Sequence, residues 1–232
     1  MGEMVTFSSS GDIDEGYLAL PESGSGPGVV VIQEWWGLVD HIKDVVDRCA
    51  AEGFVALAPD FFHGITTSEP DEAARLMMGL AMDRAGQDIA GAASYLTHRA
   101  EVSGTGIGVV GFCAGGSLAL WSATISPDVT TAVGFYPAIP WEKMSPSWGS
   151  YAAKSAMIHC SEEDGTSMAD GIQLARQGIE EAGGAVQLYD YPETQHAFFN
   201  DDRPEVYHVE AAQLAWQRTL NLLHSRLSPS PG

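Results

Sequence analysis

Residues Gly106–Ala119 read G-I-G-V-V-G-F-C-A-G-G-S-L-A and decide the fold that we predict for this chain. The apolar run Ile107–Phe112 is typical of a buried strand, and Ser117–Ala123 is typical of a helix. Cys113 stands at the turn between them, in the pattern G-x-C-x-G of a nucleophile elbow with cysteine in place of serine. Glycines on both sides allow the strand and the helix to pass close together. We therefore expect the Cys113 thiol at a helix N-terminus, where the dipole favours a thiolate.

Two simpler interpretations of this stretch compete with a catalytic one. A free cysteine is most often a small buried hydrophobic residue. In addition, Gly106, Gly108 and Gly111 match the G-x-G-x-x-G pattern of dinucleotide-binding proteins. That pattern must follow a strand and open a helix, whereas these glycines precede and interrupt the apolar run. We therefore reject the dinucleotide interpretation, and the role of Cys113 depends on residues elsewhere in the chain.

The composition bounds the possible functions. The chain has 232 residues, 45% of them hydrophobic and 18% charged, with a formal net charge of −20. Such a chain can bury a sizeable core, and its acidity argues against nucleic acids and anionic membranes as partners. An anionic substrate would need a local arginine. We find neither a transmembrane-length apolar stretch nor a signal peptide, and we expect a cytoplasmic monomer that acts on a small molecule without a cofactor.

The cysteines and histidines argue against a disulfide framework and a metal site. Cys49, Cys113 and Cys160 are an odd number, so one thiol is always left over, and the other two lie in apolar patterns typical of packing residues. This usage indicates a reducing compartment. The seven histidines show no H-E-x-x-H spacing, and the chain has no C-x-x-C motif, so we expect no metal.

The order of the predicted elements gives the fold class. We expect eight strands, over Met4–Phe7, Gly16–Leu20, Gly28–Gln33, Phe54–Ala58, Ile107–Phe112, Thr131–Tyr136, Ala156–Cys160 and Val186–Tyr191. Besides the helix after Cys113, helical patterns cover Asp40–Ala51, Asp71–Met82, Gln87–Ala100, Ala169–Ala182 and Val206–Leu223. A hairpin followed by strand–helix alternation predicts an α/β fold, a mostly parallel sheet with helices on both faces. No linker divides the chain, so residues 1–232 form one predicted domain with a frayed tail at 228–232.

Three ionisable residues follow the last strands of this predicted sheet. Cys113 comes after the fifth strand, Asp164 after the seventh and His196 after the eighth, at the edge where α/β sheets gather their ligand chemistry. The order nucleophile, acid, histidine suits a triad, in which the histidine takes the thiol proton and the acid fixes its tautomer. Taken singly, His196 could be a solvated loop residue and Asp164 a turn or N-cap residue. Their joint placement favours the triad.

Glu34 is the fourth candidate, because it ends the apolar run V-V-V-I-Q beside two tryptophans. A carboxylate there would be desolvated and its pKa raised, unless the side chain turns to solvent. In the functional interpretation Glu34 lies beside Cys113 and can hold or remove the thiol proton. The backbone N–H groups of Trp35 and Ala114 would then form the oxyanion hole. The aromatic residues Trp36 and Phe198 are candidate substrate contacts.

With these residues assembled, the chain resembles the dienelactone hydrolase family of α/β-hydrolases. The resemblance runs through V-V-I-Q-E-W-W-G, A-P-D-F-F, G-F-C-A-G-G, I-H-C-S-E-E-D and Y-P-E-T-Q-H-A-F-F-N-D. It implies an α/β-hydrolase fold with Cys113, Asp164 and His196 as the triad. It also implies that Glu34 activates the cysteine: in that family the glutamate pairs with the thiol at rest, and a Cys–His ion pair is the working state.

The departures from the family pattern concern the substrate. Family members that hydrolyse dienelactone bind its carboxylate with two arginines, because the guanidinium fork matches that group. The first is expected in the helix after the fourth strand, where Arg75 is the candidate. The second is expected four residues after the histidine, where this chain has Asn200; Arg203 is a possible substitute, although both arginines could also be ordinary surface residues. The glycine expected before the catalytic acid is replaced by S-E-E.

The sequence thus predicts a cysteine-dependent hydrolase of an ester or lactone, with dienelactone (carboxymethylenebutenolide) as the leading substrate and an acyl-thioester on Cys113. The alternatives are a carboxylesterase or thioesterase with a different small substrate and, in another class, a non-catalytic redox sensor whose thiol oxidises reversibly. The sequence does not decide whether the Trp141–Trp148 segment covers the site.

Overall fold

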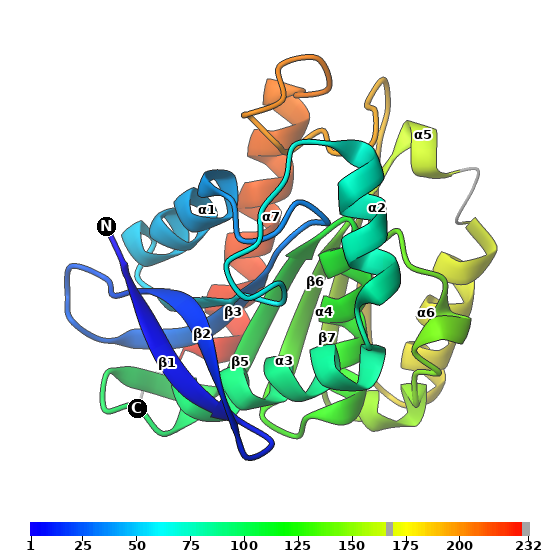
Figure 1. Ribbon diagram of the computed structural model, residues 1–232. Coiled ribbons are helices and arrows are strands. Elements are labelled where there is room, and N and C mark those ends of the chain that lie inside the picture. Colours follow the sequence, from blue (N-terminus) through cyan, green and yellow to red (C-terminus); the bar gives the residue numbers. More distant parts are fainter. Residues whose placement is uncertain (166–168, 229–232) are drawn as a thin grey trace.

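All eight strands of the computed structural model lie in one sheet, and the structure describes residues 1–165 and 169–228 (Figure 1). The strands are β1 (Glu3–Ser9), β2 (Asp12–Ala19), β3 (Gly26–Ile32), β4 (Val55–Pro59), β5 (Val102–Phe112), β6 (Val129–Phe135), β7 (Ser155–Ser161) and β8 (Ala185–Tyr191). Their order across the sheet is β1-β2-β4-β3-β5-β6-β7-β8. β1 and β2 pair antiparallel, β2 pairs antiparallel with β4, and all other neighbours are parallel.

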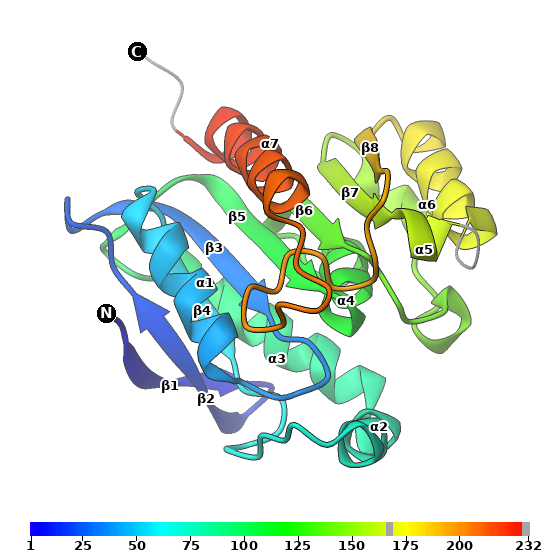
Figure 2. The ribbon, with the colours of Figure 1, turned by 90° about the horizontal axis from the view of Figure 1, so that it is seen from above.

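Helices cover both faces of the sheet, as predicted. The α-helices are α1 (Asp40–Ala51), α2 (Pro70–Gly79), α3 (Met82–Thr97), α4 (Ala114–Ile125), α5 (Glu162–Gly165), α6 (Ala169–Glu181) and α7 (Val209–Leu227). Seen from above, α1 and α7 lie on one side of the sheet and α3 and α4 on the other (Figure 2). Within the described part of the chain, no helix is both long and apolar enough to cross a membrane.

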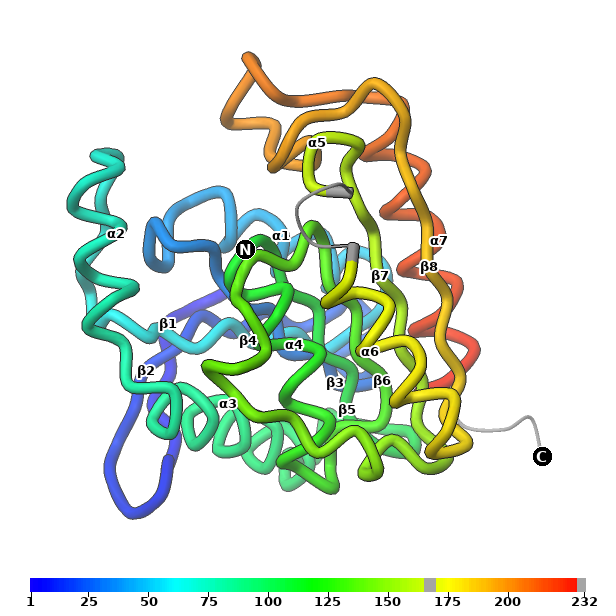
Figure 3. Tube along the Cα trace, turned by 90° about the vertical axis from the view of Figure 1, so that its right-hand side faces the viewer, coloured from blue at the N-terminus to red at the C-terminus, as the bar shows by residue number. Residues whose placement is uncertain are grey.

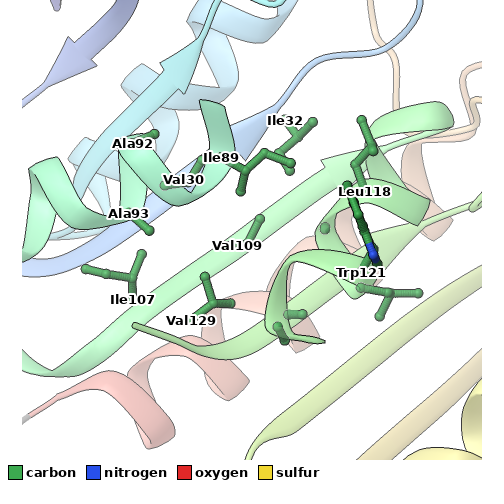
Figure 4. Packing of buried hydrophobic residues seen from close by; sticks show 14 of the residues in the cluster. Val30, Ile32, Ile89, Ala92, Ala93, Ile107, Val109, Leu118, Trp121 and Val129 are labelled. Carbon is green, nitrogen blue, oxygen red and sulfur yellow. The ribbon is translucent and has the colours of Figure 1, made fainter. Parts of the chain in front are cut away.

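Successive side chains of the central strands point to opposite faces of the sheet and form two hydrophobic cores. Val29 and Val31 of β3 face the α1 and α7 side, whereas Val30 and Ile32 face α3 and α4. Figure 4 shows the second core, in which Ile89, Ala92 and Ala93 of α3 lie over the sheet beside Leu118 and Trp121 of α4. A strand covered on both faces must be apolar at every position, which is why β3 reads as a continuous apolar run.

Several predicted element boundaries differ from the structure; β2, for example, begins at Asp12, four residues before the predicted start at Gly16. β5 begins at Val102, five residues before the apolar run, because Gly104 and Gly106 adopt positive φ angles and allow an irregular pairing with β3. Helix α2 ends at Gly79 and α3 begins at Met82, so the break falls earlier than the pattern indicates. Helix α7 begins at Val209, because the His208 side chain accepts a hydrogen bond from the backbone of Ala211 (3.3 Å). Residues 229–232 of the predicted tail lie outside the described residues.

The predicted elbow forms between β5 and α4. Cys113 has φ 55° and ψ −119°, a conformation that costs energy in any residue with a side chain. Its backbone N–H donates to the carbonyl of Phe135 (3.0 Å), and its own carbonyl accepts from Gly116 (2.9 Å). A Cβ on Gly111 would overlap the carbonyl oxygen of Gly115, so strand and helix meet backbone to backbone. The elbow therefore depends on glycine at these positions.

Replacing Gly111 by alanine should destabilise the whole fold. The added Cβ meets main-chain atoms that cannot move without breaking β5 or α4. We expect the free energy of unfolding to fall by about 3 kcal/mol or more. Urea denaturation of Gly111→Ala, compared with Gly79→Ala, measures this. A Cβ on Gly79 meets no atom within 4 Å, so that control should change stability by less than about 1 kcal/mol. Equal effects would show that the close approach at the elbow is not limiting.

Candidate active site

The three triad candidates meet at the C-terminal edge of the sheet. Cys113 follows β5 and precedes α4, Asp164 lies in α5 directly after β7, and His196 lies in the loop after β8. The acidic stretch Glu162–Gly165 forms the short helix α5. Figure 3 shows α5 and the loop that precedes α7 at the same end of the molecule as the upper end of α2. Parallel strands bring these residues together although they lie far apart in the sequence.

Asp164 and His196 form a hydrogen-bonded pair. Nδ1 of His196 lies 2.6 Å from Oδ2 of Asp164, and the hydroxyl of Ser161 donates to the same oxygen at 2.7 Å. The backbone N–H of His196 also donates to Oε2 of Glu163 (2.8 Å). A carboxylate held at Nδ1 leaves Nε2 as the nitrogen that can exchange a proton with the thiol. The serine and the glutamate of the S-E-E segment therefore orient the pair.

The environment of His196 favours its charged form. Burial alone would lower its pKa, but hydrogen bonds with Asp164 and Cys113, and the negative charges of both groups, raise the pKa to about 10. Tyr136 packs edge-on against the imidazole, with ring centroids 5.0 Å apart. Cys113 and His196 line the same cavity, so the imidazole is placed where it can exchange a proton with the thiol.

The other two cysteines have a different chemical environment. Cys49 and Cys160 are buried, and desolvation raises the pKa of each to about 12. Cys113 is half-buried and lines a cavity. A thiol must be reachable and ionisable to react, so only Cys113 among the three is suited to nucleophilic chemistry.

Glu34 is buried, with 2% of its surface exposed, which excludes the solvent-facing alternative. The amide of Asn200 donates to its Oε2 at 2.9 Å. Desolvation raises the pKa of Glu34, while His41, Asn200, His196 and Arg203 act in the opposite direction. Among the described residues, its Oε1 has no hydrogen-bond partner, so the carboxylate is not hydrogen-bonded to the thiol here.

A cavity of about 380 Å³ opens over Cys113. Its wall consists of Trp35, Met77, Cys113, Ala114, Ala138, Ile139, His196 and Arg203. The wall is apolar apart from the thiol, the imidazole and one guanidinium. Trp35 and Ala114, whose backbone N–H groups are the candidates for an oxyanion hole, lie in the same wall as the thiol. The alternating sequence patterns gave no signal for Met77 and Ile139, which come from α2 and from the loop after β6.

Three predicted substrate contacts lie elsewhere. Arg75 is exposed, donates to the carbonyl of Asp71 (3.3 Å) and takes no part in the cavity wall, because the apolar side of α2 faces inward. Phe198 is fully buried against Tyr136 and Tyr191, so its ring belongs to the core. Trp36 lines a second cavity of about 400 Å³, which also includes Asn200 and Arg203.

The Trp141–Trp148 segment packs away from the thiol. It contains the 3₁₀ turn Trp141–Lys143 and leads into a second at Trp148–Tyr151. Nε1 of Trp141 donates to the carbonyl of Gly171 in α6 (2.7 Å), and the two tryptophan rings stack edge to face. The segment is therefore part of the α6 side of the molecule. Among the described residues, no cluster of three or more His, Cys, Asp or Glu side chains is arranged to hold a metal ion.

An eight-stranded, mostly parallel sheet with an elbow after β5, an acid after β7 and a histidine after β8 is the α/β-hydrolase fold. The sequence profile of the Dienelactone hydrolase family matches residues 15–227, and the chain belongs to that family. It is therefore a hydrolase of the class that acts on carboxylic ester bonds.

Named relatives cover nearly the whole chain. A protein named usf from Aquifex pyrophilus is 35% identical over 227 residues, covering 95% of this chain and 96% of its own length. A candidate carboxymethylenebutenolidase from Aquifex aeolicus strain VF5 is 30% identical over 234 residues, covering 98% of this chain and all of its own. The crystal structure of a candidate dienelactone hydrolase from Klebsiella pneumoniae is 26% identical, with a TM-score of 0.82 over 95% of this chain and 97% of that one.

Removing the carboxylate at Nδ1 should lower the pKa of His196. In the wild type we expect an imidazole titration midpoint near 10, because hydrogen bonds outweigh the burial that would lower it. In Asp164→Asn we expect the midpoint to fall by at least about one unit towards the ordinary value. Histidine side-chain NMR follows both midpoints. His159, whose pKa burial lowers to about 3, is the internal control and should stay neutral throughout. An unchanged midpoint in the variant would refute the pairing.

Proposed function

We propose that this protein hydrolyses a small lactone or ester through an acyl-thioester on Cys113. The observation that carries the proposal is the thiol at the start of α4, beside the Asp164–His196 pair and open to an apolar cavity. A helix N-terminus and an adjacent imidazolium both favour a thiolate, which is the reactive form of cysteine. The alternative of a redox sensor has no need for the hydrogen-bonded acid and histidine.

In the proposed mechanism the thiol proton moves from Sγ to Nε2 of His196. The thiolate attacks the carbonyl carbon, and the backbone N–H groups of Trp35 and Ala114 receive the negative oxygen. When the tetrahedral intermediate collapses, the ring C–O bond of a lactone breaks and His196 returns the proton to the departing oxygen. Water, deprotonated by His196, then cleaves the thioester and restores the thiol.

Dienelactone, which would yield maleylacetate, is the leading substrate within this proposal. Carboxymethylenebutenolidase is the activity named for the Aquifex aeolicus relative. Arg203 is the cation in the wall of the catalytic cavity and can bind a substrate carboxylate. The second candidate is a less anionic ester or thioester. It is favoured by Asn200, an uncharged amide at the position where dienelactone-binding members of the family are expected to carry arginine, and by the outward position of Arg75.

Replacing the nucleophile should abolish turnover without unfolding the chain. We expect Cys113→Ala to lose about 10³-fold or more in rate, because no other reachable thiol can form the thioester. The rate is measured as loss of dienelactone absorbance in the ultraviolet, with Cys49→Ala as the matched control that keeps its activity. Full activity of Cys113→Ala would rule out the thioester route. Peroxide-dependent modification of Cys113 in a protein without esterase activity would support the redox sensor instead.

The two arginines should differ in their effect on substrate binding. We expect Arg203→Gln to raise KM about 10-fold for a lactone that carries a carboxylate and to leave an uncharged ester unaffected. Arg75→Gln is the matched control and should change neither KM, because Arg75 lies outside the cavity wall. A wild type that hydrolyses uncharged esters but not dienelactone would select the second candidate. Equal effects of both variants would refute the assignment of Arg203.

A further inference from the structure

Tyr136 lies beside the nucleophile and has no role in the mechanism described so far. It directly follows β6, whose last residue, Phe135, accepts the hydrogen bond from the backbone N–H of Cys113 (3.0 Å). Its own N–H donates to the carbonyl of His159 on β7 (2.7 Å), and its φ angle is 37°. Residues with side chains seldom adopt this backbone conformation, which is concentrated at functional sites.

The hydroxyl of Tyr136 is buried and unpartnered. The residue is 0% exposed, and among the described residues its oxygen has no hydrogen-bond partner. Within the described part of the chain, Oε1 of Glu34 is likewise buried without a hydrogen-bond partner. Buried polar atoms without partners are rare, because each keeps the cost of losing its water. Tyr136 and Glu34 therefore supply one donor and one acceptor that both lack a hydrogen-bond partner among the residues that the structure describes.

These two groups belong to one electrostatic cluster. The Tyr136 ring packs on His196, with centroids 5.0 Å apart. Burial, followed by the negative charge of Glu34, raises the pKa of Tyr136 well above its ordinary value. Cys113 and Asp164 act in the same direction with smaller effects, and Arg203 opposes them. The phenol therefore keeps its proton and remains a donor.

We propose that Tyr136 is a positioning residue for Glu34, and that a rotation of the Glu34 side chain brings Oε1 into a hydrogen bond with the Tyr136 hydroxyl. This inference rests on the proposed cysteine chemistry. A hydroxyl can donate to a carboxylate or accept from a carboxylic acid, so it can serve Glu34 in both protonation states. When the thiol proton has moved to His196, the hydrogen bond holds the carboxylate of Glu34 away from the thiolate and reduces the repulsion between the two anions.

Losing the donor should make the anionic forms of the site harder to reach. Without the Tyr136 hydroxyl, the Glu34 carboxylate is no longer held away from Sγ, and the repulsion between the two anions makes the Cys113 thiolate harder to form. The acid limb of the pH profile for Cys113 reactivity should therefore move to higher pH by about one unit. The variant should also be at least as heat-stable as the wild type, because it removes an unsatisfied buried oxygen.

The test is the rate of Cys113 alkylation by iodoacetamide as a function of pH, followed by mass spectrometry, in the wild type and in Tyr136→Phe. Tyr151→Phe is the matched control: this tyrosine is equally buried, but its hydroxyl donates to the carbonyl of Leu120 (2.7 Å). We expect Tyr136→Phe to shift the acid limb without losing heat stability. We expect Tyr151→Phe to lower the melting temperature and leave the pH profile unchanged.

Measuring the effect of Tyr136→Phe on Cys113 alkylation again in the Glu34→Gln background shows whether Tyr136 acts through Glu34 or directly on the thiol. If Tyr136 acts through Glu34, the substitution Tyr136→Phe causes no further shift in that background. A shift of the same size there, or no shift in the wild-type background, would overturn the proposal. Alkylation needs no ester, so the inference is tested even with an unknown substrate. A wild-type Cys113 that reacts like an ordinary thiol would instead contradict the proposed function.

Discussion

The close contact between β5 and α4 is the constraint on which the rest of this site depends. A strand and a helix that are joined by one residue can pass each other only if their backbones touch, and Gly111 and Gly115 make that possible. The turn residue is then forced to a positive φ angle, which lifts its side chain above the sheet edge. The energetic cost is met by the cores on both faces of the sheet, which hold the Cys113 thiol in place.

Three carboxylates, those of Glu34, Glu163 and Asp164, lie in the site behind the apolar wall around this thiol, in a chain with a net charge of −20. Negative groups oppose thiolate formation, so each must be neutralised or turned aside locally. Asp164 is hydrogen-bonded to the imidazole of His196, and Glu163 accepts from the backbone N–H of the same residue. Glu34 accepts from the side-chain amide of Asn200. Arg203 lies between the catalytic cavity and the second cavity, and its Nε donates to Glu205 (2.9 Å). These hydrogen bonds fix the three carboxylates in place and limit their repulsion of a thiolate at Cys113.

The sequence was sufficient for the parts of the fold that follow from periodicity and chain order. The strand–turn–helix around Cys113 formed as expected, the helix Asp40–Ala51 has the predicted bounds, and the eight strands were all found. Side-chain directions were harder to predict. Ala73 of α2 is buried and Leu76 packs against the core, which leaves Arg75 on the outer side of the helix.

Other features depend on contacts that local sequence does not contain. Ala197 adopts a φ angle of 68°, which separates the direction of His196 from that of Phe198 and leaves the phenylalanine in the core. The hydrogen bond between Asn200 and Glu34 joins two loops whose residues lie 166 positions apart in the sequence. Neither could be read from a pattern of apolar residues, because each is decided by the packing of several loops against one another.

The shallow packing of helix α2 affects how the cavity can change during evolution. Ala73 is its one buried residue, yet the same helix supplies Met77 to the cavity wall. The rest of the cavity wall comes from the elbow and from loops that also carry Cys113 and His196, so changes there disturb the site itself. Substitutions on α2 exchange little buried surface, so they can reshape the cavity almost independently of folding. A lineage could acquire a new substrate there while its catalytic machinery stayed intact.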